Sequence, residues 1–386
     1  MKKIAIYYPY FTGGGAEAVA LWILQALKEK YDLTLFVIGD VNFEKLNSLY
    51  GTSLSKQNIK VITFVPSYLT DVCYFMMANS NQIRMIFLHL LLRFFKQNCE
   101  NYDLVMSAYN AMDLGKSGIQ YIHWIKVVEG TPFHHKISKF SEIQLAKNLS
   151  LTNSYCVATA AKETYGVDTR VVFPPVVMDS SNVAWSDKED AFICSGRLVK
   201  AKEPHKVIQI LKKVREQGFD IKLHITGGGG GVYQWQYNRL IRKMVAENSS
   251  WITLYENLPY KDYIQVLAKC KYGIHFKKEP FGISIAEMVK AGAIPFVRSV
   301  GGQIEVVGQH NEELFFNNEE EAVDKIIAVL KNSTTQNKLI QSLTEQKTLF
   351  STHKFMSEIN DVVDSYFDKQ LNTSKLEKLP VINSQI

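Results

Sequence analysis

Residues 279–287 read EPFGISIAE, and this stretch decides the fold of the chain. The apolar run at 272–276 just before it predicts a buried strand. Pro280 fixes φ and Gly282 permits a positive φ, so a tight turn follows the strand. The next residues predict a helix that ends at Gly292. A strand, a glycine turn and a helix in this order are typical of an α/β domain.

Two carboxylates lie around the predicted turn. The N–H groups in the first turn of a helix have no partner within the helix, and together they favour a phosphate. Glu279 stands just before the turn, and Glu287 lies about one turn into the helix. Carboxylates accept hydrogen bonds from hydroxyl groups, so the arrangement suits a ligand with phosphates and hydroxyls, such as a sugar nucleotide. An ordinary strand-to-helix turn with two solvated glutamates is the alternative.

The spacing of Glu279 and Glu287, with Pro-Phe-Gly after the first, resembles the signature of family-4 retaining glycosyltransferases (glycosyl transferases group 1). The resemblance implies the GT-B fold: an α/β chain with two Rossmann-like domains facing each other across a cleft and a C-terminal helix that crosses back to the first domain. It implies that Glu279 lies beside the transferred sugar and that Glu287 binds the ribose of the nucleotide. Phe281, Gly282 and Ile283 would contact the same donor.

The composition is that of a globular chain. Its 386 residues suit two domains, and 46% hydrophobic with 21% charged residues argues against disorder. No apolar run is long enough to span a membrane, and residues 1–8 predict a strand rather than a signal peptide. The net charge of +6 permits attraction to phosphates or anionic lipid, and we expect no nucleic-acid partner.

Five scattered cysteines lack metal-ligand spacing and indicate reduced thiols in a cytoplasmic protein. The sequence contains no Asp-x-Asp, the signature of the metal-clamped glycosyltransferases. We therefore expect no metal and no cofactor, with a nucleotide diphosphate sugar as co-substrate. The expected location is the cytoplasm, with the inner face of the cytoplasmic membrane as a further option.

Pro174 and Pro175, followed by polar residues at 179–190, predict the linker between the domains. We expect the chain to divide into four parts. An N-terminal Rossmann-like acceptor-binding domain covers 1–178, and a C-terminal Rossmann-like nucleotide-sugar-binding domain covers 191–350. A helix at 351–369 then packs back on the N-terminal domain, and a flexible tail follows at 370–386.

A glycine loop follows the first predicted strand and reads TGGGAE at 12–17. Its glycines let the backbone approach a ligand, and the helix after it turns its positive end toward the loop. A dinucleotide fingerprint fits only loosely, so a dehydrogenase stays as an alternative. The resemblance implies that Gly14 and Gly15 close over the donor phosphates and the acceptor, with Glu17 after them.

A second loop begins where a predicted strand ends at Gly196. Arg197 follows directly, and Lys202 comes five positions later. A solvated basic loop is the plain interpretation. In the family that the sequence resembles, this pattern grips the donor diphosphate with the planar fork of an arginine and the point charge of a lysine. Glu203 replaces the glycine or asparagine that is usual after the lysine.

His123 ends another predicted strand, at the sheet edge where open α/β folds bind ligands. A lone histidine is more often structural. Its Tyr-x-His context resembles the mannosyltransferases that extend dolichol-linked oligosaccharides, which implies contact with the sugar or the acceptor. The glycine run that begins at Gly227 and ends at 231, and the strand at 252–259 with Tyr255, resemble the nucleotide pocket of the family.

Residues 83–96 are unusually apolar, with His89, Arg93 and Lys96 on one side of a predicted helix. One interpretation is a core helix of the first domain. The other is an interfacial helix with its basic residues at the lipid headgroups. The second would suit a lipid-linked acceptor and a peripheral membrane contact.

The resemblance implies a retaining glycosyltransferase, and the lack of Asp-x-Asp predicts that it is metal-independent. It would move a sugar from a UDP- or GDP-sugar to a glycan or lipid-linked acceptor, in surface polysaccharide or glycolipid biosynthesis. We assign catalysis to four residues, Glu279, His123, Arg197 and Lys202. The basic pair and the helix after Gly282 would stabilise the leaving diphosphate. Two alternatives stay open: a nucleotide-sugar epimerase of GT-B fold and a non-catalytic nucleotide-sugar-binding protein.

Overall fold

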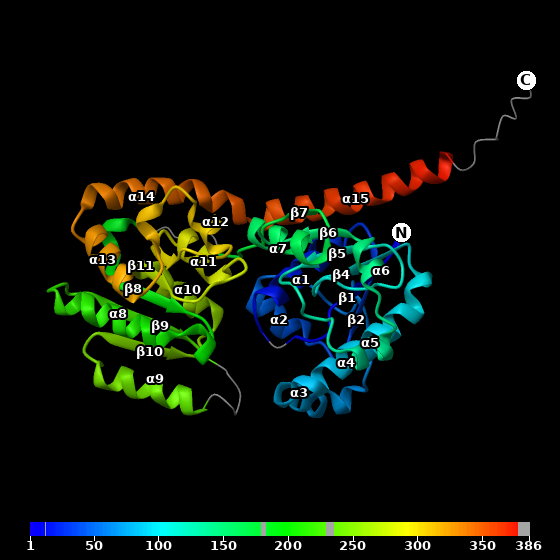
Figure 1. Cartoon of the computed structure of the whole chain (residues 1–386), viewed down its shortest axis with the longest axis horizontal. Helices are drawn as coiled ribbons and strands as arrows, with labels where there is room; N and C mark the ends of the chain where they lie inside the picture. Colours follow the sequence, from blue (N-terminus) through cyan, green and yellow to red (C-terminus); the bar gives the residue numbers. More distant parts are fainter. Residues whose placement is uncertain (12, 179–182, 229–234, 377–386) are drawn as a thin grey trace, which may run out of the picture.

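The computed structural model describes residues 1–11, 13–178, 183–228 and 235–376. In this part of the chain two α/β domains lie side by side, and each is built around one parallel sheet (Figure 1). The strand order in each sheet is that of a Rossmann-type fold. The predicted fold class, α/β with two Rossmann-like domains, is therefore confirmed.

The first sheet has seven parallel strands in the order β3-β2-β1-β4-β5-β6-β7. Its central strands are short apolar runs that are buried on both faces, which is typical of parallel sheets covered by helices. In β1, Ile4 pairs with Leu33 of β2 on one side and with Leu104 of β4 on the other. The strand bounds are β1 Lys3–Tyr7, β2 Asp32–Val37, β3 Lys60–Thr63, β4 Leu104–Ser107, β5 Ile119–Ile122, β6 Leu149–Thr152 and β7 Thr169–Val171.

The second sheet has six parallel strands in the order β10-β9-β8-β11-β12-β13. Tyr272 of β11 pairs with Phe192 of β8 and with Ile294 of β12, and these three residues belong to the buried core of this domain. The strand bounds are β8 Glu189–Ser195, β9 Lys222–Gly227, β10 Ile252–Glu256, β11 Cys270–His275, β12 Ile294–Arg298 and β13 Phe315–Phe316.

Each sheet has a topological switch point beside its first strand, between β1 and β4 and between β8 and β11. Open α/β sheets bind ligands outside the carboxyl ends of the strands at such a point. Gly14 and Gly15 follow β1, Arg197 and Lys202 follow β8, and Glu279 follows β11. The topology therefore brings these predicted site residues to the two sheet edges where ligands bind in such folds.

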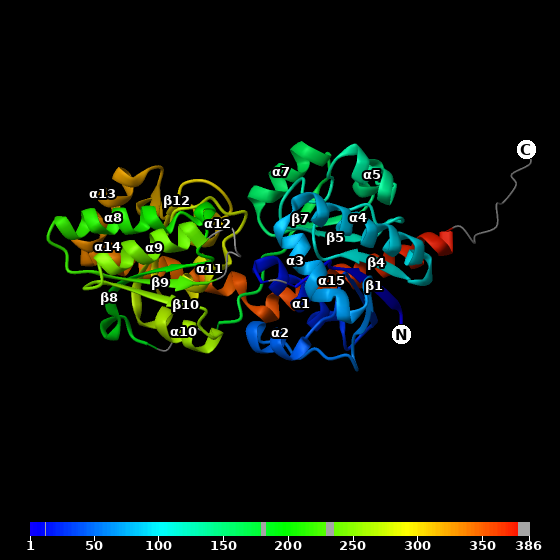
Figure 2. The ribbon, with the colours of Figure 1, turned by 90° about the horizontal axis from the view of Figure 1, so that it is seen from below.

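Helices flank both sheets, as the two perpendicular views show (Figures 1 and 2). In the first domain they are α1 Gly15–Leu27, α2 Phe43–Tyr50, α3 Thr70–Asn79, α4 Asn81–Asn98, α5 Pro132–Ser138, α6 Glu142–Ala146 and α7 Tyr155–Tyr165, with 3-10 turns η1 Ser67–Leu69 and η2 Cys99–Asn101. In the second they are α8 Pro204–Glu216, α9 Trp235–Glu247, α10 Tyr260–Lys269, α11 Ile283–Lys290, α12 Gln303–Val307, α13 Glu319–Leu330 and α14 Ser333–Gln346, with η3 Trp185–Asp187, η4 Lys200–Lys202, η6 Glu312–Leu314 and η7 Lys347–Phe350.

The last helix, α15 (Thr352–Leu376), returns to the first domain and packs along α1 (Figure 1). Phe355, Ile359 and Val363 on one face of α15 are buried in the core of the first domain. The predicted crossing helix is confirmed. It also continues through residues 370–376, where the sequence predicted a flexible tail, and the rest of that tail, 377–386, lies outside the described residues.

The chain crosses between the domains at residues 176–178. Val176 and Met178 belong to the core of the second domain, whereas Val177 packs against the core of the first. Residues at the end of the predicted 1–178 domain therefore already contact the second. Residues 179–182 of the predicted linker lie outside the described part of the chain.

Helix α4 covers the apolar stretch for which a core helix and a membrane-contacting helix were both predicted. Its residues Leu88, Leu91 and Phe95 are buried in the first domain. His89, expected on the polar side, is also buried and hydrogen-bonds Ser138 Oγ at 2.8 Å through Nδ1. Lys96 pairs with Asp113 at 2.5 Å. One face of this helix is therefore a core face, and His89 belongs to it because it has a buried hydrogen-bond partner.

Candidate functional site

The site is organised around the turn between β11 and α11. Gly282 caps α11 with φ of 107°, a left-handed conformation that favours glycine. The backbone of Glu279 is held on both sides: its N–H donates to Gln303 Oε1 at 2.6 Å, and its carbonyl accepts from the Gly302 N–H at 2.9 Å. A β-carbon at Gly302 would lie 1.9 Å from the Pro280 carbonyl oxygen, so only glycine permits this approach. The turn at Gly301 and Gly302 thus fixes the turn at 279–282.

The Glu279 carboxylate forms a buried network with Lys202 and His275. Lys202 Nζ lies 2.5 Å from Glu279 Oε1, and His275 Nε2 lies 3.1 Å from the same oxygen. Burial by itself would raise the pKa of Glu279, but the hydrogen bond from His275 and the charge of Lys202 outweigh it and lower the pKa to about 2. Glu279 is therefore ionised at neutral pH although only 12% of its side chain is exposed.

Glu287, one to two turns into α11, has different surroundings. Its carboxylate accepts hydrogen bonds from the hydroxyls of Tyr260 at 3.3 Å and Tyr263 at 2.8 Å, both on α10. Burial raises the pKa of Glu287 to about 7, and the two tyrosine hydroxyls only partly oppose this. Near neutral pH this carboxyl group therefore exchanges a proton readily.

The sequence alone did not identify His275, Gln303, Tyr260 or Tyr263. His275 was taken as part of a buried strand, and its position four residues before Glu279 at the strand end was the signal that could have found it. Gln303 follows the glycine pair that contacts the Glu279 turn. The tyrosines carry no sequence signal, because α10 contacts α11 only in the tertiary structure.

The N-terminus of α11 meets the glycine loop of the first domain. A β-carbon at Gly15 would lie 2.7 Å from Cδ1 of Ile283, the flexible end of that side chain, so the loop and α11 are in close contact across the two domains. The N–H groups of Ile283 and Ser284 find no acceptor among the described residues and lie in the first turn of the helix. They are the donors that the anion seat predicted from the sequence would use.

The glycine loop is held by its own helix and by α2. Gly13 N–H donates to Glu17 Oε2 at 2.9 Å, and Gly14 N–H donates to the Tyr50 hydroxyl at 3.2 Å. Glu17 is only 2% exposed. Burial and then the charge of Glu17 raise the pKa of Tyr50, and the charge of Glu287 contributes to the same shift. Tyr50 thus lies between the two domains, near the carboxylates of both.

His123 directly follows β5 and is 9% exposed. Its Nε2 lies 3.0 Å from the carbonyl oxygen of Ala108, which can only accept, so Nε2 carries the hydrogen. Burial lowers the pKa of His123 to about 4, against a smaller opposing effect of that hydrogen bond. His123 is therefore neutral, and its Nδ1 is an acceptor to which no described residue donates.

Three contacts join the His123 side of the first domain to the Glu279 turn. Ser154 Oγ donates to the Pro280 carbonyl at 2.7 Å, and Lys278 Nζ lies 5.9 Å from the ring centre of Trp124. Glu305 of α12 accepts hydrogen bonds from two backbone N–H groups at the start of α7, those of Tyr155 at 2.8 Å and Cys156 at 2.7 Å. A carboxylate at a helix N-terminus is favourable for charge as well as for hydrogen bonding.

Three further residues of the predicted site, Arg197, Phe281 and Tyr255, differ in their exposure and contacts. Arg197 is exposed, and none of the described residues accepts a hydrogen bond from its side chain. Phe281, for which a donor contact is predicted, is 2% exposed, and its ring packs against Phe173 and Phe350. Tyr255 is half-buried, with its ring 5.8 Å from that of His224.

The glycines after β8 and β9 pack against each other. A β-carbon at Gly227 would lie 2.0 Å from the Gly196 carbonyl oxygen, and Gly196 itself lies next to the Lys202 side chain. Gly227 is therefore required by packing at this edge. Residues 229–231 of the predicted glycine run lie outside the described residues.

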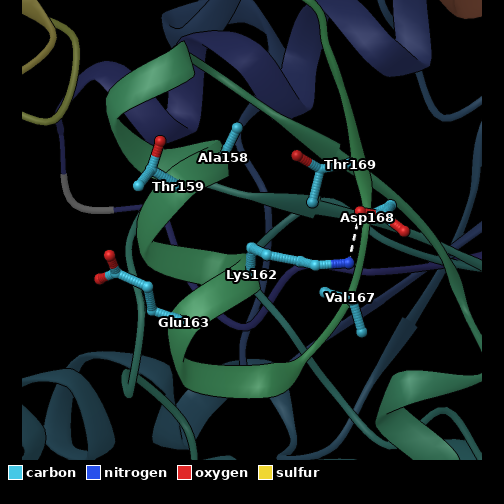
Figure 3. A pocket seen from close by; sticks show the side chains of 7 residues that line it. All are labelled: Ala158, Thr159, Lys162, Glu163, Val167, Asp168 and Thr169. Atoms are coloured by element: carbon cyan, nitrogen blue, oxygen red, sulfur yellow. Dashed lines mark hydrogen bonds and ion pairs between the residues drawn. The ribbon is translucent and has the colours of Figure 1, made fainter.

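A separate pocket on the first domain lies away from these residues. Lys162 and Asp168 line it and form an ion pair at 2.7 Å, and the other lining residues are Ala158, Thr159, Glu163, Val167 and Thr169 (Figure 3). Within the described ranges, no group of three or more His, Cys, Asp or Glu is arranged to hold a metal ion. None of the described helices combines the length and apolarity needed to cross a membrane.

We compared the chain with families of known proteins. Residues 179–346 match the family model described as Glycosyl transferases group 1. The matched stretch contains Arg197, Lys202, Glu279 and Glu287. No curated protein sequence matches the chain.

Solved structures of glycosyltransferases share the fold of the whole chain. Anabaena Alr3699/HepE, in complex with UDP and glucose, is 16% identical, with a TM-score of 0.69, 95% of this chain and 100% of that chain being covered. Sucrose-phosphate synthase from Thermosynechococcus elongatus is 13% identical, with a TM-score of 0.66 and coverage of 96% and 100%. WaaG, a glycosyltransferase involved in lipopolysaccharide biosynthesis, is 12% identical, with a TM-score of 0.62 and coverage of 93% and 99%. The chain has the GT-B fold.

Proposed function

Starting from the group 1 match at residues 179–346 and the GT-B fold of the chain, we propose that this protein is a retaining glycosyltransferase. It transfers a sugar from a nucleotide diphosphate sugar to a glycan or lipid-linked acceptor. The observation that carries the proposal is the buried pair of Lys202 and Glu279 at the carboxyl ends of β8 and β11, beside the N-terminus of α11. A cation, an anion and a phosphate seat are the groups that this transfer needs.

The leaving diphosphate gains negative charge as the bond to the sugar breaks. Lys202 and the first-turn N–H groups of α11 stabilise that charge, and the exposed Arg197 closes on the diphosphate when the donor binds. These groups supply the positive charge for which other glycosyltransferases use a metal, so transfer proceeds without one. Activity that persists undiminished in a chelator supports this point, and activity restored only by added Mg²⁺ or Mn²⁺ contradicts it.

Glu279 lies ionised beside the transferred sugar, where its charge stabilises positive charge at the anomeric carbon. The neutral His123 accepts a hydrogen bond at Nδ1 from a hydroxyl of the sugar or the acceptor. Glu287 accepts hydrogen bonds from the ribose. Transfer keeps the anomeric configuration of the donor, which NMR of the product tests directly; an inverted product contradicts a retaining enzyme.

UDP-sugars are the first donors to test, because HepE is described in complex with UDP and with UDP-glucose, and GDP-sugars are the second. The acceptor belongs to surface polysaccharide or glycolipid biosynthesis. Exposed apolar side chains on η1 and α3, namely Tyr68, Val72 and Phe75, support a partner with an apolar part and a peripheral contact of the first domain with a membrane.

Vesicle binding tests the membrane contact. Val72→Glu and Phe75→Glu should reduce co-sedimentation of the protein with anionic lipid vesicles, because each buries a charge at the lipid surface. Ile143→Glu, at an exposed apolar residue on α6, is the matched control and should not. Equal sedimentation of all three variants and the wild type would remove this part of the proposal.

The decisive experiment is a screen of UDP-, GDP- and ADP-sugars for nucleotide release, with membrane extract as acceptor, in the wild type and in Glu279→Ala. We expect release with one donor that depends on acceptor and is lost in the variant. Donor turnover without any acceptor would indicate an epimerase instead. Tight donor binding with no release under any condition would leave a nucleotide-sugar-binding protein.

A further inference from the structure

We propose that His275 is a positioning residue for Glu279: its imidazole holds one carboxylate oxygen so that the other oxygen faces the donor sugar. The proposal rests on the glycosyltransferase function proposed above and assigns a role to a residue that the sequence did not single out. It follows from the location of His275, from the oxygen to which it binds, and from the second partner of that oxygen.

His275 is fixed in place by the sheet. It is the last residue of β11, pairs with Val297 of β12, and is 2% exposed. An ionised carboxylate can only accept, so the Nε2 atom that lies 3.1 Å from Glu279 Oε1 carries the hydrogen. Burial lowers the pKa of His275 despite the neighbouring Glu279, so the ring is neutral and donates through Nε2 alone. A strand backbone thus directs one N–H at Glu279.

The two partners of Glu279 share one oxygen. Lys202 Nζ and His275 Nε2 both contact Oε1. No described residue donates to Oε2. Since a carboxylate is planar, holding Oε1 on one side and the backbone of Glu279 on the other leaves little freedom for Oε2. This is the oxygen that is available to a sugar hydroxyl or to an anomeric carbon.

Donor binding separates the roles of the two partners. The diphosphate of a donor attracts the charged Lys202 away from Glu279, because the lysine is part of the proposed diphosphate site. The diphosphate does not attract the neutral His275, and the pairing of β11 with β12 holds this residue in place. It therefore keeps Oε1 occupied at the moment when Lys202 is shared with the leaving group, and Glu279 keeps its orientation.

A purely structural role makes a different prediction. A buried histidine that merely satisfies its hydrogen bond affects stability when replaced, and the folded fraction then has normal kinetics. A positioning role affects kcat in the fully folded protein, because a misplaced reacting group loses rate with little change in binding. The donor KM should stay constant, since His275 contacts no part of the donor.

The test uses two variants of nearly equal size. The amide nitrogen of a glutamine occupies the position of a histidine Nε2, whereas that of an asparagine occupies the position of Nδ1. We expect His275→Asn to lower kcat by about 10- to 100-fold with the donor KM within about threefold, and His275→Gln to keep kcat within about threefold. Melting temperature and circular dichroism confirm that each variant is folded before kinetics are measured.

The outcomes separate the two proposals. If the wild type releases no nucleotide with any donor, the glycosyltransferase function fails and this role fails with it. If the wild type is active and His275→Asn is equally active, or His275→Gln is as impaired as His275→Asn while both are folded, only the role of His275 is overturned. The role is supported further if the apparent pKa of the acid limb in the pH profile of kcat rises in His275→Asn and stays unchanged in His275→Gln. Such a rise means that Glu279 binds its proton more readily when the N–H of His275 is lost.

Discussion

The surroundings of Glu279 and of Glu287 differ although both residues belong to one turn and helix. Glu279 lies beside a cation and an imidazole N–H, which lower its pKa to about 2. Glu287 lies beside two tyrosine hydroxyls and no cation in the described structure, and burial raises its pKa to about 7. One carboxyl group is therefore a fixed charge and the other a group that takes up or releases a proton near neutral pH. Groups with such separated pKa values serve different roles.

The largest expected effect is on catalysis. Glu279→Gln removes the fixed charge while keeping the shape of the side chain, and we expect kcat to fall by about 10²- to 10³-fold, as for other single electrostatic stabilisers. Glu287→Gln is the matched control, because the same chemical change at a ribose contact should raise the donor KM and keep kcat within about tenfold. Steady-state nucleotide release measures both, and equal losses of kcat would contradict the assigned division of roles.

The same two variants should change stability in opposite directions. The folded pKa of Glu279 lies below its ordinary 4.5, so its stabilisation is present above pH 4.5 and is lost as the pH falls through 2. The folded pKa of Glu287 lies above 4.5, so the corresponding stability is present below pH 4.5 and is lost as the pH rises through 7. At pH 8 we expect Glu279→Gln to lower and Glu287→Gln to raise the free energy of unfolding, each by roughly 3 kcal/mol.

Urea unfolding of the wild type and both variants between pH 4 and 8 measures this. The wild type and Glu287→Gln should converge toward the acidic end of that range, where Glu287 is protonated. A stabilising effect of Glu287→Gln that is equally large at both ends would show that its ionisation is not the cause.

Removing the positive charge of Lys202 should make the surroundings of the Glu279 carboxyl group more like those of Glu287, which has no cation beside it among the described residues. Lys202→Met takes the positive charge from both the leaving diphosphate and the Glu279 carboxylate, so we expect kcat/KM to fall by about 10²-fold and the pKa of Glu279 to rise. Lys200→Met is the control, because Lys200 is an exposed lysine in the same turn η4. Donor titrations and the pH profile of kcat are the measurements; equal effects of the two variants would refute a specific role of Lys202.

The smallest expected effect tests how far the Glu279 environment depends on the contact between the domains. Glu305 lies on α12 with Gln303, which holds the Glu279 backbone, whereas the two tyrosines that hydrogen-bond Glu287 lie in the second domain. Glu305→Gln weakens the charged cap of α7 by about 1 kcal/mol, so we expect a several-fold loss of kcat and little change in donor KM. Glu163→Gln, an exposed residue of α7, is the control. Small-angle scattering should show a wider spread of domain separations in Glu305→Gln alone.

Sequence patterns predicted the features that depend on the spacing of neighbouring residues, namely the strands and the glycine turns. The apolar runs predicted buried strands, which a parallel sheet needs because both of its faces are covered, and the resemblance implied two Rossmann-like domains. Glycines at 14, 15 and 282 predicted the places where backbone approaches backbone or ligand. The pairing of Lys202 with Glu279 was expected only as membership of one site, since seventy-seven positions separate the two residues. The resemblance placed them together, and the sheet order explains why they meet.

The sequence by itself determined the fold class, the two glycine turns and the residues that stand at the carboxyl ends of the strands, because these depend on periodicity and on the φ values that single residues allow. Only the tertiary structure decided the charge state of each carboxyl group. That state depends on which side chains face it across the packing: His275 and Lys202 for Glu279, Tyr260 and Tyr263 for Glu287. The pKa of a buried group is set by its partners in space and by its distance from water, and neither is written in the spacing of the motif.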